Sequence, residues 1–495
     1  MAQSGSRAHD PESTETTPLI LRVEDVRYVD PEVDRLATLA LSQLQVEVGL
    51  ESVDSLEAPQ DRAYHFVVLL RLKAALHMQI ASRDADDLSS DLEVQRKMSI
   101  VDSSLAHHDK TLHDGSVQDV GEFLFTDFLL REGNSSVVRA IDMLHGAETP
   151  DQLVRNRILE LAYLRLWKYG HQLSKKKSTA VDRITRPFWR FSTPRIMHLL
   201  DLALFLLYFV ALIHYAVQPP LTPVEPVQAL VPRLREAFIM LYAFSQLFKP
   251  WEVTIVPYIL TSLAFLSCLP LVPRSQDGAY SVLLFTVSLH LLQLHLPRSP
   301  SPLLLIPFDM ALPLATLVQH GIFKIFIPVI TFFLPALLLA LFLLSTSLSD
   351  LLQHFLTLAT TTSPSPLEAR TAFLTLLAFI FILLLCSLMM LILVYPQLSS
   401  RDPPPLRWDR YSTPIGLEAR RALISTVANY TQPTYFPAPL NIFHFILVRT
   451  PRWISSLFGW KSRTSTTDLI QGALWLVFVT PLAFVLSGLY LWGYL

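Results

Sequence analysis

The chain has 495 residues, of which 51% are hydrophobic and 17% charged, and its formal net charge at pH 7 is -2. The near-zero net charge indicates no nucleic-acid partner, and two cysteines cannot build a disulfide framework or a Cys/His zinc site. Because the apolar excess falls after Ile196, the sequence predicts an all-α, multi-pass membrane protein with an N-terminal helical domain in the cytosol.

Residues 1–30 are predicted to form a disordered tail, since Ser, Thr, Glu and Pro are frequent there. Within this tail, Glu15 precedes Leu19 and Ile20 in the arrangement of an acidic dileucine sorting signal. Sorting adaptors read that arrangement as a route to the vacuole or lysosome, although so short a pattern also arises by chance. The first interpretation predicts a vacuolar or other endomembrane protein whose N-terminus is cytosolic.

Residues 31–173 carry amphipathic segments and predict a cytosolic domain of packed helical hairpins. Within residues 61–82, apolar side chains recur every three or four positions, which is the spacing of one helix face. Arg62, Arg71 and Lys73 interrupt this run, so we expect a buried helix of a soluble domain rather than a membrane span. The domain has no phosphate-binding glycine loop and no nucleophile elbow, and we predict no catalytic residue and no cofactor.

Residues 83–117 are polar, and we expect a flexible linker between helices of this domain. The segment contains His107, His108 and His113. Three histidines in a flexible stretch can bind a metal ion, but a solvated linker is the simpler interpretation, and we predict no metal site.

Residues 174–195 form a basic juxtamembrane segment before the first span. Its basic side chains are Lys175, Lys176, Lys177, Arg183, Arg186, Arg190 and Arg195. Such a cluster marks the cytosolic side of the membrane and attracts anionic lipid headgroups by about 1 kcal/mol per basic residue. Membrane lipids are therefore a predicted partner, and specific phosphoinositide binding is a further hypothesis.

Apolar stretches predict seven membrane spans, arranged as six channel-like spans and one C-terminal span. The first four make a four-span bundle over residues 196–296, and its fourth span has no repeat of Arg or Lys that could sense voltage. Asp201 lies about a turn inside the first span beside Arg195, and we expect a paired carboxylate there. The predicted spans are 196–217, 229–248, 253–272, 278–296, 325–347, 372–395 and 469–495.

Residues 303–322 are apolar but broken by Pro307 and Pro313. If this segment spanned the membrane, the basic residues between Arg401 and Arg463 would leave the cytosol, which the positive-inside rule disfavours. We therefore expect an interfacial helix that couples the four-span bundle to the next span.

Residues 325–395 consist of two apolar runs around a polar interruption and resemble, in outline, one quarter of a tetrameric cation pore. The alternative is two ordinary spans joined by an ordinary loop. In the pore interpretation, the filter needs oxygen ligands, and the interruption has no glycine that would free backbone carbonyls. This leaves the selectivity for calcium open. The candidate pore or filter residues are Asp350, Thr360, Thr361, Thr362 and Glu368.

Residues 396–468 are predicted to return to the cytosol. They contain a short helix over Leu417–Val427, with Arg420 and Arg421 on its charged face, and an amphipathic helix over residues 440–458 that would lie on the membrane. The last predicted span covers residues 469–495.

Three short sequences resemble segments of the fungal vacuolar TRP-type (transient receptor potential-like) calcium and cation channels. They are Leu39–Gly49, which resembles the start of a linker helical domain, Phe248-Lys-Pro-Trp251 at the third span, and Tyr435-Phe-Pro-Ala-Pro-Leu-Asn441-Ile after the sixth. The resemblance implies a calcium-permeable channel of the vacuolar membrane that assembles as a tetramer of identical chains.

The sequence thus predicts a cation channel of an intracellular membrane without voltage-sensor charges, with calcium as one candidate ion. The alternatives are a non-conducting scaffold or adaptor that binds partners through the helical domain, and a transporter. We do not predict an enzyme, because Asp201, His214, His290 and His295 are scattered over separate spans.

Overall fold

The structure is a computed structural model that describes most of the chain in separate stretches. Among the described residues, the regular elements are helices apart from one sheet, in which β1 (Phe128–Leu129) pairs antiparallel with β2 (Val137–Val138). The predicted all-α class is confirmed. The described residues are 27–49, 58–81, 88–114, 116–131, 137–170, 193–220, 234–249, 253–268, 272–275, 278–298, 300–305, 307–339, 367–399, 406–431, 435–451, 454 and 470–492.

The chain divides into two compact units, and each is described by itself. The first unit consists of Met1–Thr111 and Gly121–Met143, and the second of Leu112–Val120 and Leu144–Leu495. Helices that belong to or begin in the first unit are α1 (Val29–Thr38), α2 (Leu41–Val48), α4 (Pro59–Ala81) and α5 (Leu88–Asp114). Two further helices cross a boundary between the units, α6 (Val117–Phe125) and α7 (Ala140–Leu144).

Helix α4 is the centre of the first unit, at the position where the sequence predicts a helix over residues 61–82. Eight of its side chains are buried, including Phe66 and Leu69. Helix α1 packs along α4, because the buried side chains of α1 recur at Val29, Val33 and Leu36, which is one helix face. The Tyr64 hydroxyl fixes this pairing by donating a hydrogen bond of 3.0 Å to the Tyr28 carbonyl.

Helix α5 occupies the stretch expected to be a flexible linker, and that prediction was wrong. The buried residues Val94, Val101 and Leu105 recur at spacings of seven and four, which places them on one face of a helix. This narrow apolar stripe is enough to pack a helix whose other faces are polar, and it is easily missed in a polar segment.

His108 belongs to the buried side of α5 and is not solvated, contrary to expectation. Its Nε2 lies 3.0 Å from Nδ1 of His65 on α4, and the His108 side chain is fully buried. Burial lowers the pKa of His108 to about 3 and the pKa of His65 to about 4. The pair is therefore neutral at physiological pH and joins α4 to α5 by a hydrogen bond between uncharged rings.

From Leu144 on, the second unit passes through α8 (Asp151–Arg155) and α9 (Arg157–Tyr169) into a bundle of four apolar helices. These are α11 (Pro194–Val217), α12 (Leu234–Gln246), α13 (Val256–Ser267), which follows the short η2 (Val253–Ile255), and α14 (Gly278–Leu294). They correspond to the four expected spans of residues 196–296. Local sequence fixes the start of α11, where the Thr193 side chain accepts from the Ile196 amide and Pro194 occupies the first turn.

An aromatic and polar cluster fills the middle of this bundle. The ring of Tyr208 on α11 stacks on Tyr242 on α12, with 4.5 Å between centroids. The Tyr208 hydroxyl lies 3.0 Å from Nε2 of His290 on α14 and 3.3 Å from the hydroxyl of Thr261 on α13. One tyrosine thus links all four helices and gives buried polar groups their partners.

A second set of elements follows the bundle. The short η3 (Pro302–Leu305) leads into α15 (Phe308–His320), which continues through the π-helical η4 (Gly321–Phe326) as one helix to Leu339. The expected interfacial helix and the expected fifth span are therefore continuous in the backbone, and the π-helical turn lies where they were expected to separate.

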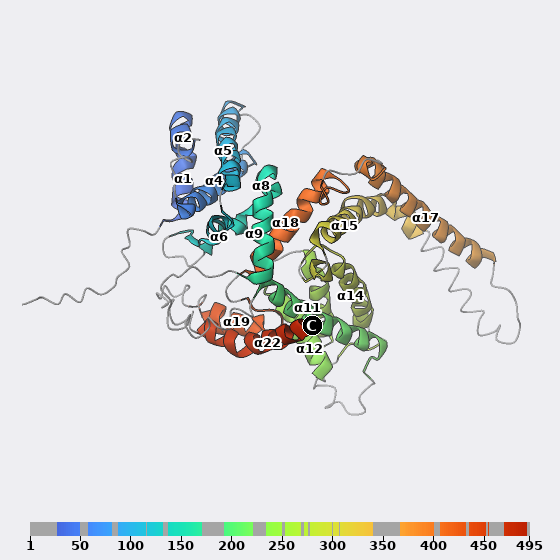
Figure 1. The fold of residues 1–495 in the computed structure, drawn as a ribbon. Coiled ribbons are helices and arrows are strands. Elements are labelled where there is room, and N and C mark those ends of the chain that lie inside the picture. Colours follow the sequence, from blue (N-terminus) through green and yellow to red (C-terminus); the bar gives the residue numbers. More distant parts are fainter. Residues whose placement is uncertain are drawn as a thin grey trace, which may run out of the picture. The chain divides into compact units, whose positions relative to one another are not determined.

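The chain then passes through α17 (Leu367–Val394) and η5 (Pro396–Ser399) to α18 (Thr413–Tyr430), which packs along α15 (Figure 1). Ser412 caps α18 by accepting from the Ile415 amide. The remaining helical elements are α19 (Asn441–His444), the π-helical η6 (Phe445–Arg449) and η7 (Trp475–Val479), and α22 (Thr480–Trp492).

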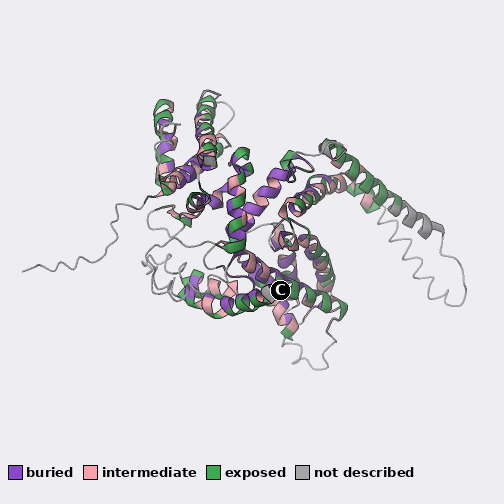
Figure 2. Ribbon diagram, in the orientation of Figure 1, coloured by how far each residue is buried: buried purple, intermediate pink, exposed green. Residues whose placement is uncertain are grey.

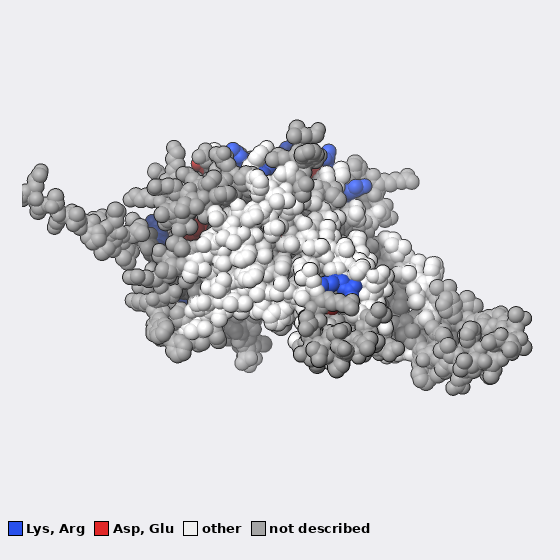
Figure 3. Space-filling view, turned by 90° about the horizontal axis from the view of Figure 1, so that it is seen from below, with Lys and Arg blue, Asp and Glu red and all other residues white. Residues whose placement is uncertain are grey.

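Apolar surface dominates the second unit, as expected for a membrane protein. Three helices among the described residues are long and apolar enough to cross a membrane: Pro194–Val217, Phe308–Leu339 and Ile470–Gly488. Figure 2 shows α17 exposed along its described side chains, of which only Leu383 is buried. Figure 3 shows a broad face with few charged side chains among the described residues. Such a surface is stable in lipid or against other apolar chains.

Candidate functional site

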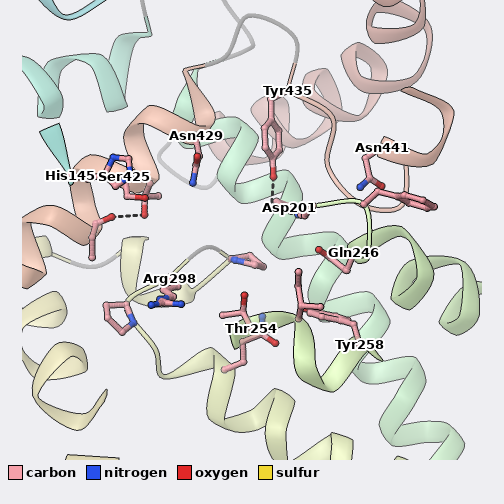
Figure 4. Close-up of a pocket in the computed structure, with 18 of the residues that line it drawn as sticks. His145, Asp201, Gln246, Thr254, Tyr258, Arg298, Ser425, Asn429, Tyr435 and Asn441 are labelled. Atoms are coloured by element: carbon pink, nitrogen blue, oxygen red, sulfur yellow. Dashed lines mark hydrogen bonds and ion pairs between the residues drawn. The ribbon is translucent and has the colours of Figure 1, made fainter. Parts of the chain in front are cut away.

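A polar cavity of about 660 Å³ lies in the second unit, between the four-helix bundle and the segments that follow α17. Figure 4 shows Asp201, Gln246 and Tyr258, from the bundle, on one side and Ser425 and Asn429, from α18, on another. The walls therefore come from parts of the chain that are far apart in sequence, and they are brought together by the packing of α11 with α18.

We call the part of the lining formed by Asp201, Gln246 and Asn441 the floor of the cavity. Its Asp201 carboxylate is only 1% exposed. Its Oδ2 accepts hydrogen bonds from the hydroxyls of Tyr430, at 3.0 Å, and Tyr435, at 2.8 Å, and lies 3.6 Å from Nζ of Lys249. A buried carboxylate is tolerated only with such partners. The sequence predicted a paired Asp201 with Arg195 beside it, whereas the partners described here come from the loop after α12 and from the region after α17.

Several polar atoms of the lining have no hydrogen-bond partner within the described stretches. They include Oδ1 of Asp201, Nε2 of Gln246, Oδ1 of Asn441 and the hydroxyl of Tyr258. Gln246 is 4% exposed, and the other end of the Asn441 amide is fixed because its Nδ2 donates to the Ser245 carbonyl at 2.8 Å. These atoms are therefore buried polar groups of residues that line the cavity, without a hydrogen-bond partner among the described residues.

The charged residues elsewhere in the lining are mostly basic. Four basic residues line it, against the two acids Asp201 and Glu418, and the bases are Lys249, Arg298, Arg421 and Arg449. Arg449 donates to the Phe248 carbonyl at 3.4 Å, and Arg421 donates to the Thr149 carbonyl at 3.2 Å. Lys249 pairs with Asp201 at 3.6 Å and Arg421 with Asp151 at 3.2 Å, so part of this positive charge is already balanced, which reduces the attraction of the cavity for anionic groups.

Two of the three segments singled out by resemblance meet at this cavity. Phe248 and Lys249 line it from one side, and Tyr435, Phe436 and Asn441 line it from another. The Phe248 ring stacks on Phe445, with 4.1 Å between centroids. Sequence reasoning singled out both segments but could not tell that they share one site, because no local pattern encodes a contact across so much chain.

A second polar cluster joins the ends of α15, α17 and α18, and we call it the junction. His320, at the end of α15, bonds through Nδ1 to the Tyr395 hydroxyl at 2.5 Å and through Nε2 to Glu418 on α18. Lys324 lies 3.4 Å from the other Glu418 oxygen and 3.1 Å from the His320 ring. The His320 hydrogen bond, assisted by Lys324, holds the pKa of Glu418 below its ordinary value.

Arg420, expected on the charged face of its helix, is instead buried, and that prediction was wrong. It is 4% exposed, and its guanidinium lies 5.5 Å from the ring centroid of Trp408. The Trp408 indole donates to Glu160 of α9 at 2.9 Å. Burial lowers the pKa of Arg420. Its helix therefore has two buried sides, one toward α15 and one toward Trp408.

Most site residues predicted from sequence lie outside the described stretches. Asp350 and Thr360–Thr362 are among these, and Glu368 lies on α17 with its side chain outside the description. The same holds for the sorting signal Glu15, Leu19 and Ile20 and for the basic residues from Lys175 to Arg190. Arg195, in the first turn of α11, is the described member of the basic cluster. These site assignments stay predictions.

Comparison with known proteins gives no assignment. No model of a known protein family matches this sequence, and no characterised protein shows significant similarity to it. The function is therefore inferred from the chain's own residues.

Proposed function

We propose that this chain is a channel-like protein of an intracellular membrane, in which residues 325–395 of four identical chains surround a cation pore. The observation that carries the proposal is the junction of His320, Tyr395 and Glu418. It connects α15, which leads into the pore-like unit, with Tyr395, which follows α17, and with α18. A change in the bundle would reach both pore-like helices through this one cluster.

The surface of α17 supports the assembly of several copies. Ile380, Phe381, Ile382 and Met390 are all more than two-fifths exposed, and they point to different sides of one helix. One side can face lipid, and a tetramer would cover another side with neighbouring copies. Phe333, on the helix before it, contacts Phe379 edge to face and joins the two pore-like helices within one chain.

The composition of α14 supports gating by a stimulus other than voltage. This helix has no Lys or Arg, and its buried polar residues are Thr286, His290 and Gln293. A voltage sensor needs several charges that move through the field. We infer that the bundle senses a ligand or a mechanical change. We also infer that the basic residues that line the cavity face the cytosol.

The decisive experiment is current from the purified full-length protein in planar bilayers under calcium or potassium gradients. Asp350→Ala and a triple alanine at Thr360, Thr361 and Thr362 should change the conductance or the reversal potential, because these residues are the filter candidates. Matched controls are Asp468→Ala and a triple alanine at Thr464, Thr466 and Thr467. A silent bilayer with folded, inserted protein would count against the channel.

The location follows from a separate proposal. Glu15, Leu19 and Ile20 would direct the protein to the vacuole through a sorting adaptor, and anionic lipids would meet the basic segment 174–195. Glu15→Ala combined with Leu19→Ala should move a fluorescent fusion off the vacuolar membrane. An unchanged location would remove the sorting-signal interpretation.

A non-conducting scaffold is the second candidate, and one observation favours it. The first unit exposes the apolar side chains Val46, Met78 and Leu92, which are 78%, 70% and 52% exposed. Such side chains mark a binding site for another protein where they form one contiguous patch. A silent bilayer would make the partners of this unit the next question.

A further inference from the structure

Helix α9 of the second unit (Figure 1) borders a groove of about 720 Å³, which we call the α9 groove. The start of α15 and residues 406–408 form other walls of this groove. Four residues of α9 line it and follow one another at spacings of four, three and four, which places them on one face of the helix. They are Arg157, Leu161, Leu164 and Lys168. Helix α9 thus presents to the groove two apolar side chains between two basic ones.

The apolar strip of the groove is accessible. Leu161 is 49% exposed, and Leu406 on another wall is 48% exposed. Trp167, which also belongs to the lining, is only 2% exposed and meets the Phe308 ring edge to face, with 5.9 Å between centroids. This contact holds α9 against the start of α15. Packing therefore joins the walls of the groove and leaves apolar side chains that a partner can cover.

Positive charge borders the strip. Six residues of the lining are basic and two are acidic, and both acids are already engaged. Glu160 accepts from the Trp408 indole at 2.9 Å, and Asp309 lies 3.2 Å from Arg407. Three exposed bases have no ion pair within the described stretches, and they are Arg155, Arg157 and Lys168. The groove therefore offers unbalanced positive charge at both ends of its apolar strip.

We propose that the α9 groove binds an acidic amphipathic helix of another protein. Two apolar side chains of that helix would cover Leu161 and Leu164, and a carboxylate would lie beside each of Arg157 and Lys168. The order basic, apolar, apolar, basic is complemented by acidic, apolar, apolar, acidic at the same spacing, in the manner of a helix laid into a groove. Because the spacing is the same in both directions, a parallel and an antiparallel helix fit equally well. The assignment does not depend on whether the protein conducts ions.

Other occupants match the α9 groove less well. The headgroup of an anionic lipid is compact, whereas Arg157 and Lys168 lie about 16 Å apart along the helix axis. Helix α9 has 13 residues and is too short to cross a hydrocarbon core, which takes about 20. A basic partner would meet like charge, and a wholly apolar one would bury Arg157 and Lys168 without a counter-charge. Charge and spacing together therefore favour the acidic helix.

Fluorescence anisotropy of a labelled synthetic helix, titrated with the full-length protein in phosphatidylcholine nanodiscs, tests the proposal. The probe has a Leu-x-x-Leu pair with a glutamate four residues before it and another four residues after it. We expect saturable binding, weakened by about tenfold or more when lysines replace the glutamates or serines replace the leucines. A soluble short-chain phosphatidylserine should not displace the probe. Displacement would show that the groove holds a lipid, and it would overturn the proposal, as would absence of binding.

Variants decide whether the probe binds in the α9 groove. Arg157→Gln combined with Lys168→Gln should weaken binding by about fivefold or more, and Leu161→Ser should do the same. The matched controls lie on α5 of the first unit, where Arg96→Gln combined with Lys110→Gln removes the same exposed charges and Leu92→Ser the same exposed leucine. Thermal unfolding of each variant without the probe checks the fold. Equal losses in the groove variants and their controls would overturn the proposal.

Discussion

His320 and Glu418 are hydrogen-bonded across 98 residues of sequence, and they join the end of α15 to the first turns of α18. Tyr395, which follows α17, holds the other nitrogen of the same imidazole. One ring therefore bridges the two segments that flank the pore-like unit.

The junction should behave as one energetic unit. His320→Ala and Glu418→Gln should each lower the thermal unfolding temperature, and the double variant should lose less than the sum, with a coupling of at least about 0.5 kcal/mol. Arg407→Gln paired with Glu418→Gln should be additive, because Arg407 contacts Asp309 instead. Additive losses for His320 and Glu418 would show that their contact contributes nothing.

Acid should weaken the same contact. The folded-state pKa of Glu418 lies below its ordinary value of 4.5, so its stabilising effect is complete above that value and is lost as the pH falls through the folded pKa. His320, Lys324 and Tyr395 are the titratable groups that face it. The difference in unfolding temperature between wild type and Glu418→Gln should therefore be constant near pH 7 and shrink below about pH 4.5. A difference that grows in acid would contradict the lowered pKa.

Asp201 should depend on its tyrosine partners. Tyr435→Phe removes one of two hydroxyl donors to a buried carboxylate and should destabilise the second unit by about 1–3 kcal/mol. In an Asp201→Asn background the same change should cost less, because the charge that needs the donor is gone. Tyr169→Phe is the control, since Tyr169 is 71% exposed. Equal losses at both tyrosines would remove the special role of the hydroxyl.

The helical state of α5 can be tested in the first unit. Leu105 is fully buried, and Leu105→Ala should destabilise this unit by about 2–5 kcal/mol. Leu92, on the same helix and 52% exposed, should tolerate the same change within about 0.5 kcal/mol. Hydrogen exchange of the full-length protein measures the difference within the helix. A mobile linker over residues 88–114 would exchange rapidly in the wild type.

The topology gives a prediction for Asn429, which lies in the sequon Asn429-Tyr430-Thr431. Asn429 lines the cavity whose basic residues indicate the cytosolic side, so it should carry no glycan. Endoglycosidase treatment should not change the mobility of the protein on a gel, whereas a glycoprotein from the same membranes should shift. A glycan at Asn429 would reverse the orientation of the second unit.

Local signals were enough to place most helices. The apolar run from Ile196 predicts α11, and the spacing of apolar residues predicts α4 and the core of α18. The failure at α5 came from the same principle, because Val94, Val101 and Leu105 are few and widely spaced within a polar stretch. In this stretch the polar composition indicated a linker, although the spacing of its few apolar residues is that of a helix.

Contacts between distant segments could not be predicted in this way. A charged residue inside a span indicated that Asp201 needs partners, but Tyr430 and Tyr435 lie more than 200 residues away. Arg420 looks exposed in a helical projection and is buried only because Trp408 folds over it. The cavity is the sum of such contacts, so its existence was not visible in any single segment.

Glu418 takes part in two features of the molecule, since it lines the cavity and also forms the junction with His320. Any molecule that occupies the cavity therefore acts on a group that also holds the ends of α15 and α17. If its affinity differs between two arrangements of the junction, its concentration sets their ratio, and the arrangement in turn sets the affinity by the same factor. Under that condition, a single carboxylate would couple the occupancy of the cavity to the position of the helices.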